Sequence, residues 1–138
     1  MQKIIIDTNV IVAALIQRNY PHRILYDLFL EDLFLLCLSV ELLSEYYDVL
    51  SRPKFSKFSD FSTRARILLA DIASKSLYFA PSAKLDIIKD QDDNMILELA
   101  DESRADFIVT GNTNDFTFPN YKRTKILTPK DYWEQYQP

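Results

Sequence analysis

Apolar positions along the chain fall into short runs separated by stretches with helical spacing. The three isoleucines at residues 4–6 predict a buried strand, because β-branched side chains fit a sheet that is covered on both faces. Between the runs, apolar residues recur every three or four positions, which predicts helices. This alternation of strand and helix predicts a three-layer α/β/α fold around a central, mostly parallel sheet. Further strands are predicted at residues 34–38, 77–79, 106–109 and 125–127.

Polar residues mark where several of the helices begin. Ser39 is a predicted N-cap for a helix that runs to about residue 51, and Thr128 with Pro129 is predicted to cap the last helix. Residues 54–62 are polar and aromatic, so a loop is expected there, and a brief extended segment is expected at residues 86–88. The other predicted helices cover residues 10–16, 22–31, 63–76 and 90–102.

Length and composition favour one ordinary globular domain. The chain has 138 residues, of which 48% are hydrophobic, enough for one domain with a core, here residues 1–138. Its longest apolar run is too short for a membrane span, and no signal-peptide pattern precedes Asp7. The single cysteine, Cys37, lies in an apolar run, as is typical of a buried thiol in a reducing compartment. A cytoplasmic location is therefore expected.

Single residues exclude several kinds of chemistry. Gly111 is the only glycine, which excludes the glycine-rich phosphate loops of nucleotide-binding proteins. His22 is the only histidine and precedes a predicted surface helix, so neither a Ser/His/Asp site nor a zinc site is expected. The net charge of −4 disfavours a broad basic surface for nucleic acid, although acids gathered in one site can mask a local basic patch.

Four acidic residues stand where predicted strands and helices converge. Asp7 follows the first strand, at the sheet edge where open parallel sheets bind ligands. Glu45 lies within its helix, Asp93 in the first turn of another, and Asp115 after a turn at residues 110–112. Two carboxylates about 5 Å apart repel by roughly 3 kcal/mol at an effective dielectric of 20. Such a cluster suits a hard cation such as Mg²⁺.

Each acid also has a simpler interpretation. Asp7 could only cap the helix that follows it, and Glu45 could be solvated, because Glu41 and Asp48 share roughly its helix face. Asp93 could only complement the helix dipole, and Asp115 could be an ordinary turn residue. The joint pattern is more informative than any of its members.

Five blocks of sequence, in the right order, resemble the PIN-domain family and within it the stand-alone VapC-like toxin branch. The first block carries Asp7, the second Glu45, the third Asp93 and the fourth Thr110 with Gly111. The resemblance implies a PIN fold over nearly the whole chain. The blocks are residues 4–10, residues 39–45 continued by 50–55, and residues 90–100, 105–112 and 126–129.

What the resemblance implies is an endoribonuclease that depends on Mg²⁺ or Mn²⁺ and hydrolyses RNA phosphodiester bonds. Carried over by position, Asp7, Glu45 and Asp93 are the family's first three acids, with catalytic and metal-binding roles. Thr8, Asn9 and Thr110 would support them through hydrogen bonds. The resemblance also implies a homodimer and, for a toxin of a toxin–antitoxin pair, a cognate antitoxin protein.

One position departs from the family pattern. Many relatives have an aspartate after the Thr-Gly pair, whereas this chain has Asn112. An asparagine supplies an oxygen ligand without a charge, so a second cation should bind less tightly there. Either Asp115 takes over as a catalytic and metal-binding residue, or Asn112 binds a metal-held water.

Basic residues after the second acid suggest a place for the substrate. Lys54, Lys57, Arg64 and Arg66 surround the predicted loop, and contacts to RNA phosphates come mainly from lysine and arginine. The alternative is a solvated basic face.

Two other functions compete with a nuclease. A PIN fold that has lost cleavage could act as an RNA- or protein-binding module, and Asn112 keeps this interpretation open. A haloacid-dehalogenase-type phosphatase also has an aspartate after its first strand. That family requires a second aspartate where this chain has Asn9, and a glycine just beyond, which is missing.

Overall fold

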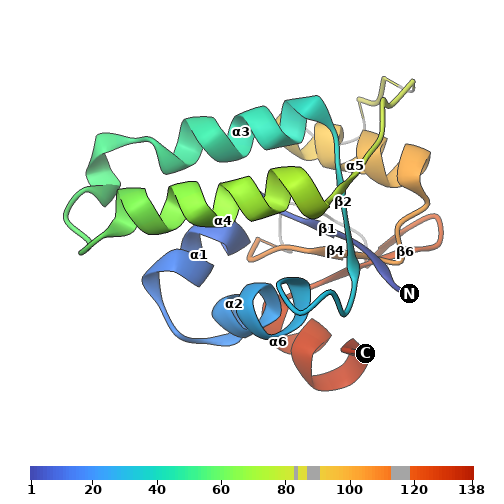
Figure 1. The fold of residues 1–138 in the computed structure, drawn as a ribbon. Helices are drawn as coiled ribbons and strands as arrows, with labels where there is room; N and C mark the ends of the chain where they lie inside the picture. Colours follow the sequence, from blue (N-terminus) through green and yellow to red (C-terminus); the bar gives the residue numbers. More distant parts are fainter. Residues whose placement is uncertain (83, 87–90, 113–118) are drawn as a thin grey trace.

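The computed structural model describes residues 1–82, 84–86, 91–112 and 119–138, with the backbone alone for 91 and 92. Six strands in these ranges form a sheet in the order β3-β2-β1-β4-β6-β5 (Figure 1). All neighbouring strands are parallel except β5 and β6, which pair antiparallel. The strands are β1 (Lys3–Ile6), β2 (Leu35–Leu38), β3 (Leu77–Tyr78), β4 (Phe107–Val109), β5 (Asn120–Tyr121) and β6 (Thr124–Leu127).

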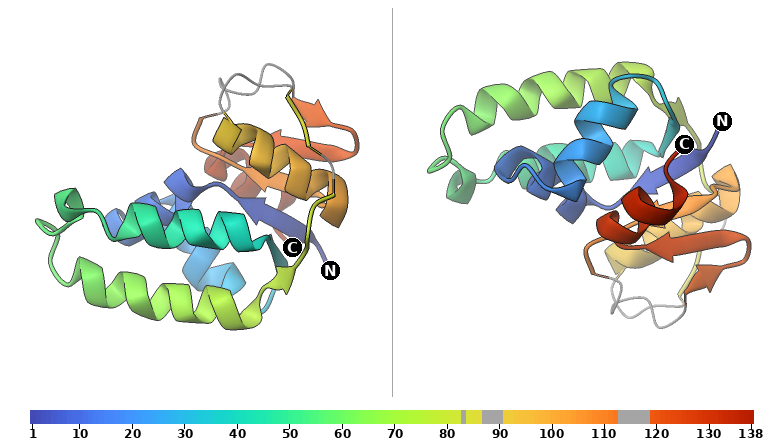
Figure 2. Two further views of the ribbon diagram at one scale, coloured as in Figure 1. Left: turned by 90° about the horizontal axis from the view of Figure 1, so that it is seen from above. Right: turned by 90° about the horizontal axis from the view of Figure 1, so that it is seen from below.

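Helices cover both faces of this sheet. In Figure 1, α3 and α5 lie above the sheet, and α2 and α6 lie below it. The two views of Figure 2 bring these two groups to the front in turn. The predicted three-layer α/β/α architecture is confirmed. The helical segments are α1 (Thr8–Ile16), α2 (Tyr20–Arg23), η1 (Ile24–Phe29), α3 (Val40–Leu50), η2 (Pro53–Phe55), α4 (Phe61–Lys75), α5 (Gln91–Ser103), α6 (Pro129–Asp131) and η4 (Tyr132–Tyr136).

The core is built around β1, as the apolar pattern predicts. Ile4, Ile5 and Ile6 are completely buried, because helices cover both faces of the central strand. Cys37 is buried in the neighbouring strand β2, and burial raises the pKa of its thiol to about 11. A thiol with so high a pKa stays protonated at neutral pH, so Cys37 is a packing residue, as predicted.

The predicted helix caps are present. The Ser39 hydroxyl accepts a hydrogen bond of 3.1 Å from the backbone N–H of Leu42 at the start of α3. The Thr128 hydroxyl likewise accepts one of 3.1 Å from Asp131 N–H at the start of α6. Asp7 is the N-cap of α1, as its simpler interpretation expects. Its carboxylate has further partners, described below.

Three local expectations need correction. The predicted loop at 54–62 is interrupted, because Phe55 is buried, stacks on Phe61 at 5.0 Å between ring centroids, and folds the chain into η2 before α4 begins. Strand β5 does not match any predicted strand, since the two residues Asn120 and Tyr121 are too few to show a strand pattern and only pairing with β6 defines it. The predicted helix at 22–31 begins earlier and continues as the wider turns of η1.

Of the extended segment expected at 86–88, residues 87 and 88 lie outside the described residues.

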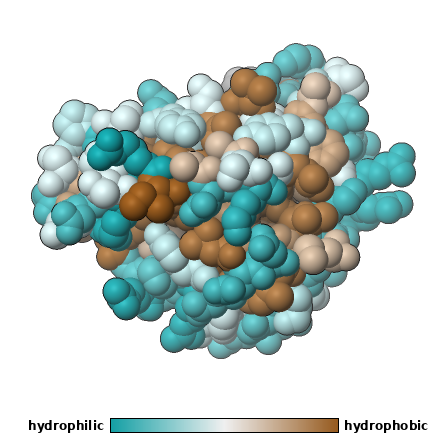
Figure 3. Space-filling view, viewed as in Figure 1, coloured by the Kyte–Doolittle hydropathy of each residue, from teal (hydrophilic) through white to brown (hydrophobic). Residues whose placement is uncertain are grey.

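The outer surface shows no concentration of apolar side chains on the face seen in Figure 3, where apolar and polar residues interleave. Exposed apolar residues on the outer helices, such as Val40 and Ile67, stand among charged neighbours. Among the described residues, no helix is both long enough and apolar enough to cross a membrane.

Candidate active site

A cavity of about 400 Å³ opens at the carboxyl end of the central strands. Three of the predicted acids line it, although they come from three elements far apart in sequence: Asp7 after β1, Glu45 from α3 and Asp93 from α5. The other lining residues are Thr8, Asn9, Val12, Val49, Lys54, Phe55 and Asn112. The tertiary structure therefore brings together the first three acids that the sequence singles out.

Asp7 is fixed by several hydrogen bonds. Its backbone N–H donates to the carbonyl of Val109 at 2.9 Å, which extends the β1–β4 pairing by one residue. One carboxylate oxygen accepts from Thr8 N–H at 2.8 Å. The other accepts from the Thr110 hydroxyl at 2.8 Å and from the Asn9 side chain at 3.3 Å. These neutral donors stabilise the charged form of a side chain that is only 8% exposed.

Glu45 is held next to Asp7 by two contacts between α3 and the end of β1. The Thr8 hydroxyl donates a hydrogen bond to the Glu45 carboxylate. The hydroxyl of Tyr46 donates to the carbonyl of Ile6, the residue before Asp7. Tyr46 is fully buried. Burial raises the pKa of its phenol, and the negative charges of Asp7 and Glu45 raise it further, so the phenol remains a donor.

Asp93 reaches the cavity from the first turn of α5. It is the third residue of that helix and is 8% exposed. The positive end of the helix dipole lies at this turn and favours a carboxylate there. Asp93 can therefore complement the helix dipole, as its simpler interpretation expects. The dipole does not explain why Asp93 lines the same cavity as Asp7 and Glu45.

The turn after β4 contributes Asn112 to the lining of the cavity. Gly111 N–H donates to the Asn9 side-chain oxygen at 2.9 Å, and Asn112 N–H donates to the Thr110 hydroxyl at 3.1 Å. A Cβ at position 111 would lie only 3.2 Å from that Asn9 oxygen, so this close approach favours glycine. Asn112 is exposed and lines the cavity, while Asp115 lies outside the described residues.

The predicted basic group does not act as one unit. Lys54 lines the cavity of the acids, with its ammonium 5.2 Å from the Phe55 ring centroid. Arg64 instead donates to the backbone carbonyls of Leu15 and Ser59, at 2.6 and 3.2 Å, so its guanidinium holds α4 against the end of α1. Lys57 and Arg66 are exposed. Of the four, Lys54 is the one with a place at the site.

His22 lies elsewhere. Its Nδ1 is 3.0 Å from the carbonyl oxygen of Ala14, and its ring stacks on Tyr26 at 4.3 Å. It lines a different cavity, beside the end of α1.

No sequence pattern singles out Tyr46, Val12, Val49 or Phe55 as residues of the site. Tyr46 is adjacent to Glu45, but nothing in the pattern distinguishes it from the exposed Tyr47 beside it. Only the packing of α3 on β1 shows that its hydroxyl reaches the Ile6 carbonyl.

A family model described as "PIN domain" matches residues 3–114, which include every described residue of the cavity. The chain belongs to the PIN-domain family. A relative of this PIN domain is an uncharacterized protein of Methanocaldococcus jannaschii, MJ1680. The two are 31% identical over 144 aligned residues, which cover 98% of this chain and 92% of that protein. Members of the PIN-domain family are typically nucleases, and PIN domains generally bind divalent metals.

The donor set of this PIN domain fits a hard divalent cation. The cavity presents three carboxylates, two asparagine side chains and one threonine hydroxyl. Their oxygen atoms are ligands of the kind that Mg²⁺ and Mn²⁺ prefer. These residues are Asp7, Glu45, Asp93, Asn9, Asn112 and Thr8. Among the described residues, no three His, Cys, Asp or Glu side chains are close enough to enclose a metal by themselves. Mg²⁺ usually keeps several waters and takes one or two carboxylates plus substrate phosphate.

Proposed function

We propose that this PIN domain is a metal-dependent endoribonuclease that hydrolyses RNA phosphodiester bonds. The observation that supports the proposal is the convergence of Asp7, Glu45 and Asp93 on one cavity at the carboxyl end of the sheet. A family assignment alone would not say whether these acids meet. The same assignment favours a nuclease over a phosphatase of the haloacid-dehalogenase kind.

The roles of the residues follow from their contacts. Asp7, Glu45 and Asp93 would hold Mg²⁺ or Mn²⁺, with Asn112 as a neutral oxygen ligand. A divalent cation bound there supplies Lewis acidity for phosphodiester hydrolysis. Thr8, Asn9 and Thr110 keep the carboxylates in place through their hydrogen bonds. Asp115 stays a candidate ligand from the sequence.

Lys54 and the apolar residues of the cavity, Val12, Val49 and Phe55, would position the substrate. Lys54 is the cationic residue among the described residues that line the cavity, so its ammonium suits a phosphate of the bound strand. Without a cation the acids repel a phosphodiester, by roughly 3 kcal/mol for each charge pair about 5 Å apart. RNA should therefore enter this cavity only when metal is present.

The first test measures metal and RNA together. Calorimetry with Mn²⁺ and Mg²⁺ on the wild type and on Asp93→Asn, followed by assay of the same samples on total cellular RNA, should show binding and cleavage in the wild type only. Asp48→Asn is the matched control, because Asp48 is an exposed acid that pairs with Arg52. No metal binding by the wild type would contradict the proposal, and binding without cleavage of any RNA would favour a binding module.

Asn112→Asp tests the one departure from the family pattern. The added charge should tighten binding of a second cation, since carboxylates hold Mg²⁺ better than amides do. If calorimetry shows the same stoichiometry and affinity as the wild type, Asn112 takes no part in holding metal.

We also propose a cellular role as the toxin of a toxin–antitoxin pair, acting in the cytoplasm as a homodimer that a cognate antitoxin restrains. The resemblance of five sequence blocks to VapC-like proteins supports this role. Expression of the wild type should arrest growth, whereas Glu45→Gln at equal protein level should not. Light scattering on the purified protein tests the homodimer.

A further inference from the structure

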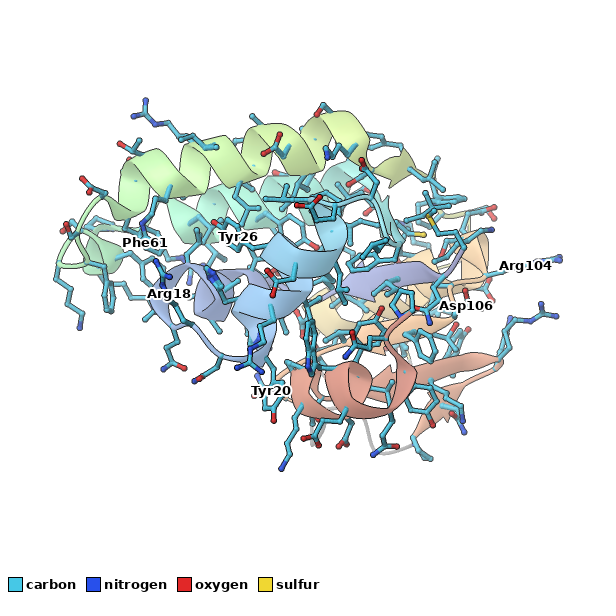
Figure 4. All side chains as sticks on the ribbon, turned by 60° about the horizontal axis from the view of Figure 1, so that its bottom comes forward. Arg18, Tyr20, Tyr26, Phe61, Arg104 and Asp106 are labelled. Carbon is cyan, nitrogen blue, oxygen red and sulfur yellow. The ribbon has the colours of Figure 1, made fainter. Side chains whose placement is uncertain are left out.

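A second cavity, of about 460 Å³, lies at the opposite edge of the sheet from the acids. It is formed between the end of α5 and the hairpin of β5 and β6, and we call it the amino-edge pocket. Arg104 comes just before β4 and Thr124 begins β6, so the pocket lies where these parallel strands start. Figure 4 places Arg104 and Asp106 at one end of the molecule and Arg18 and Phe61 at the other.

The amino-edge pocket is basic in a chain whose net charge is −4. Arg104, Lys122 and Arg123 line it, and Asp101 is its one carboxylate among the described residues. Asp101 pairs with the ammonium of Lys122, which also lies 5.6 Å from the Tyr121 ring centroid. Within the described chain, no ion pair or hydrogen bond engages the guanidinium of Arg104 or of Arg123. Two forked cationic groups are thus available to a ligand.

Two of these cations occupy backbone positions that normally favour glycine. Arg104 has φ of 54° and Lys122 has φ of 52°. Arg104 follows the end of α5, where its N–H bonds to the carbonyl of Ala100 at 2.9 Å, and Lys122 lies in the tight turn between β5 and β6. Glycine is the usual residue at both kinds of position. The other non-glycine residues with positive φ, Asp32 and Asp60, are of a type that tolerates it.

The chain therefore places cations at two strained positions, and both side chains line the same cavity. An arginine anywhere in the last turn of α5 would complement the helix dipole without a left-handed backbone, yet that turn has no basic residue. The helix dipole alone does not explain why the basic residue stands at position 104. A role of the Arg104 and Lys122 side chains in binding a ligand at the pocket would explain it.

We propose that the amino-edge pocket binds a phosphate group of the RNA backbone, away from the bond that is cut. Arginine guanidinium groups match the geometry of phosphate oxygens, and Tyr121 offers an aromatic surface beside them. RNA as the ligand rests on the proposed function. A protein of net charge −4 needs a local basic area to hold a polyanion, and the acid-lined cavity cannot provide it without metal.

The test removes two of the three cations, Arg104 and Lys122, without straining the fold. Arg104→Gly/Lys122→Gly places glycine at the two positions whose backbone suits it, so the double variant should fold as well as the wild type, as thermal unfolding will show. Lys75→Ala/Lys84→Ala is the control, because it removes the same charge from exposed positions elsewhere. Binding of a fluorescent 20-nucleotide single-stranded RNA is measured by anisotropy in EDTA, at several salt concentrations.

The double glycine variant should bind RNA at least 10-fold more weakly at low salt, and the control less than 3-fold. The slope of log affinity against log salt should fall by about 0.7, for the lost contact with one phosphate. Equal losses in both variants, no loss in either, or no RNA binding by the wild type would overturn the proposal. The proposal would also be overturned if the double variant bound RNA as the wild type does but no longer bound poly-glutamate, a polyanion without phosphate groups.

Failure of this inference can be told apart from failure of the proposed function. The binding assay contains no metal, so its outcome does not depend on whether Asp7, Glu45 and Asp93 hold a cation. If the glycine variant binds RNA normally while Asp93→Asn loses metal and cleavage, only the pocket is disproved. If RNA binding depends on the pocket and no metal binds, only the nuclease is disproved.

Discussion

The two edges of the sheet gather opposite charges and hold them in different ways. At the carboxyl edge, Asp7 and Asp93 are each 8% exposed, and Asp7 accepts hydrogen bonds from Thr110, Thr8 and Asn9. At the amino edge, the cations are exposed and two of them sit on left-handed backbone. Acids close together need buried neutral donors to remain charged, whereas exposed cations need only water. At the acidic edge, hydrogen bonds hold the carboxylates in defined positions. At the basic edge, several exposed cations lie close together without such constraints.

The largest effect is expected from a change at the centre of the acidic edge. Asp7→Asn should lower RNA cleavage by about 1000-fold, because it removes a charged ligand worth several kcal/mol in the transition state. Stability should not fall, since asparagine is also a good N-cap for α1. Cleavage in Mn²⁺ and thermal unfolding in EDTA measure the two effects. Retained cleavage would show that Asp7 is only a helix cap.

A smaller loss is expected from the donor that orients Asp7. Thr110→Val removes the 2.8 Å hydrogen bond while keeping the shape of the buried side chain, and should cost about 10- to 100-fold in metal affinity or activity. Thr110→Ser keeps the hydroxyl and is the matched variant. If both variants bind Mn²⁺ equally well in calorimetry, the hydroxyl has no role in placing the carboxylate.

A change at Tyr46 should affect both stability and the site. Tyr46→Phe leaves the buried Ile6 carbonyl without its phenol donor, which should lower the free energy of unfolding by about 1–2 kcal/mol. Urea unfolding measures this loss, with the exposed Tyr47→Phe as control. Weaker Mn²⁺ binding should accompany it, because Glu45 is the preceding residue. An unchanged midpoint of unfolding would argue against an anchoring role.

The smallest effect is expected at the basic edge, and its sign is opposite. Arg104→Gly should leave the free energy of unfolding unchanged or raise it by up to about 1 kcal/mol, because relief of the left-handed backbone outweighs the lost interaction with the helix dipole. Asp60→Gly, at φ of 57°, should gain less, since aspartate tolerates this conformation better. A clear loss of stability in Arg104→Gly would mean that the arginine serves the fold.

The sequence allowed one edge of the molecule to be predicted in some detail. Three consecutive isoleucines identify a central strand, and the residue after such a strand must lie at the sheet edge where ligands bind. Asp7 is therefore found from local pattern. Glu45 is less clear from local pattern, because Glu41 and Asp48 lie on roughly the same helix face, and the resemblance supported its choice. The structure places Glu45 on the cavity and leaves the other two exposed.

Other features could not be found from local pattern at all. The β5 strand exists only through pairing with β6, and the stack of Phe55 on Phe61 converts an expected loop into packed structure. Arg64, expected among RNA-contacting residues, uses its guanidinium on two backbone carbonyls. Each of these depends on partners that the neighbouring residues do not reveal.

The sequence by itself determined the alternation of strands and helices and the burial of β1. It also determined the resemblance to the PIN-domain family, through the sequence blocks that contain the acids. These depend on periodicity and on the residue types themselves, which are local properties. The tertiary structure alone decided which hydroxyl reaches which carboxylate, and that Arg104, Lys122 and Arg123 line one cavity. Such contacts join residues far apart in the chain, and their geometry is set by how the helices pack on the sheet.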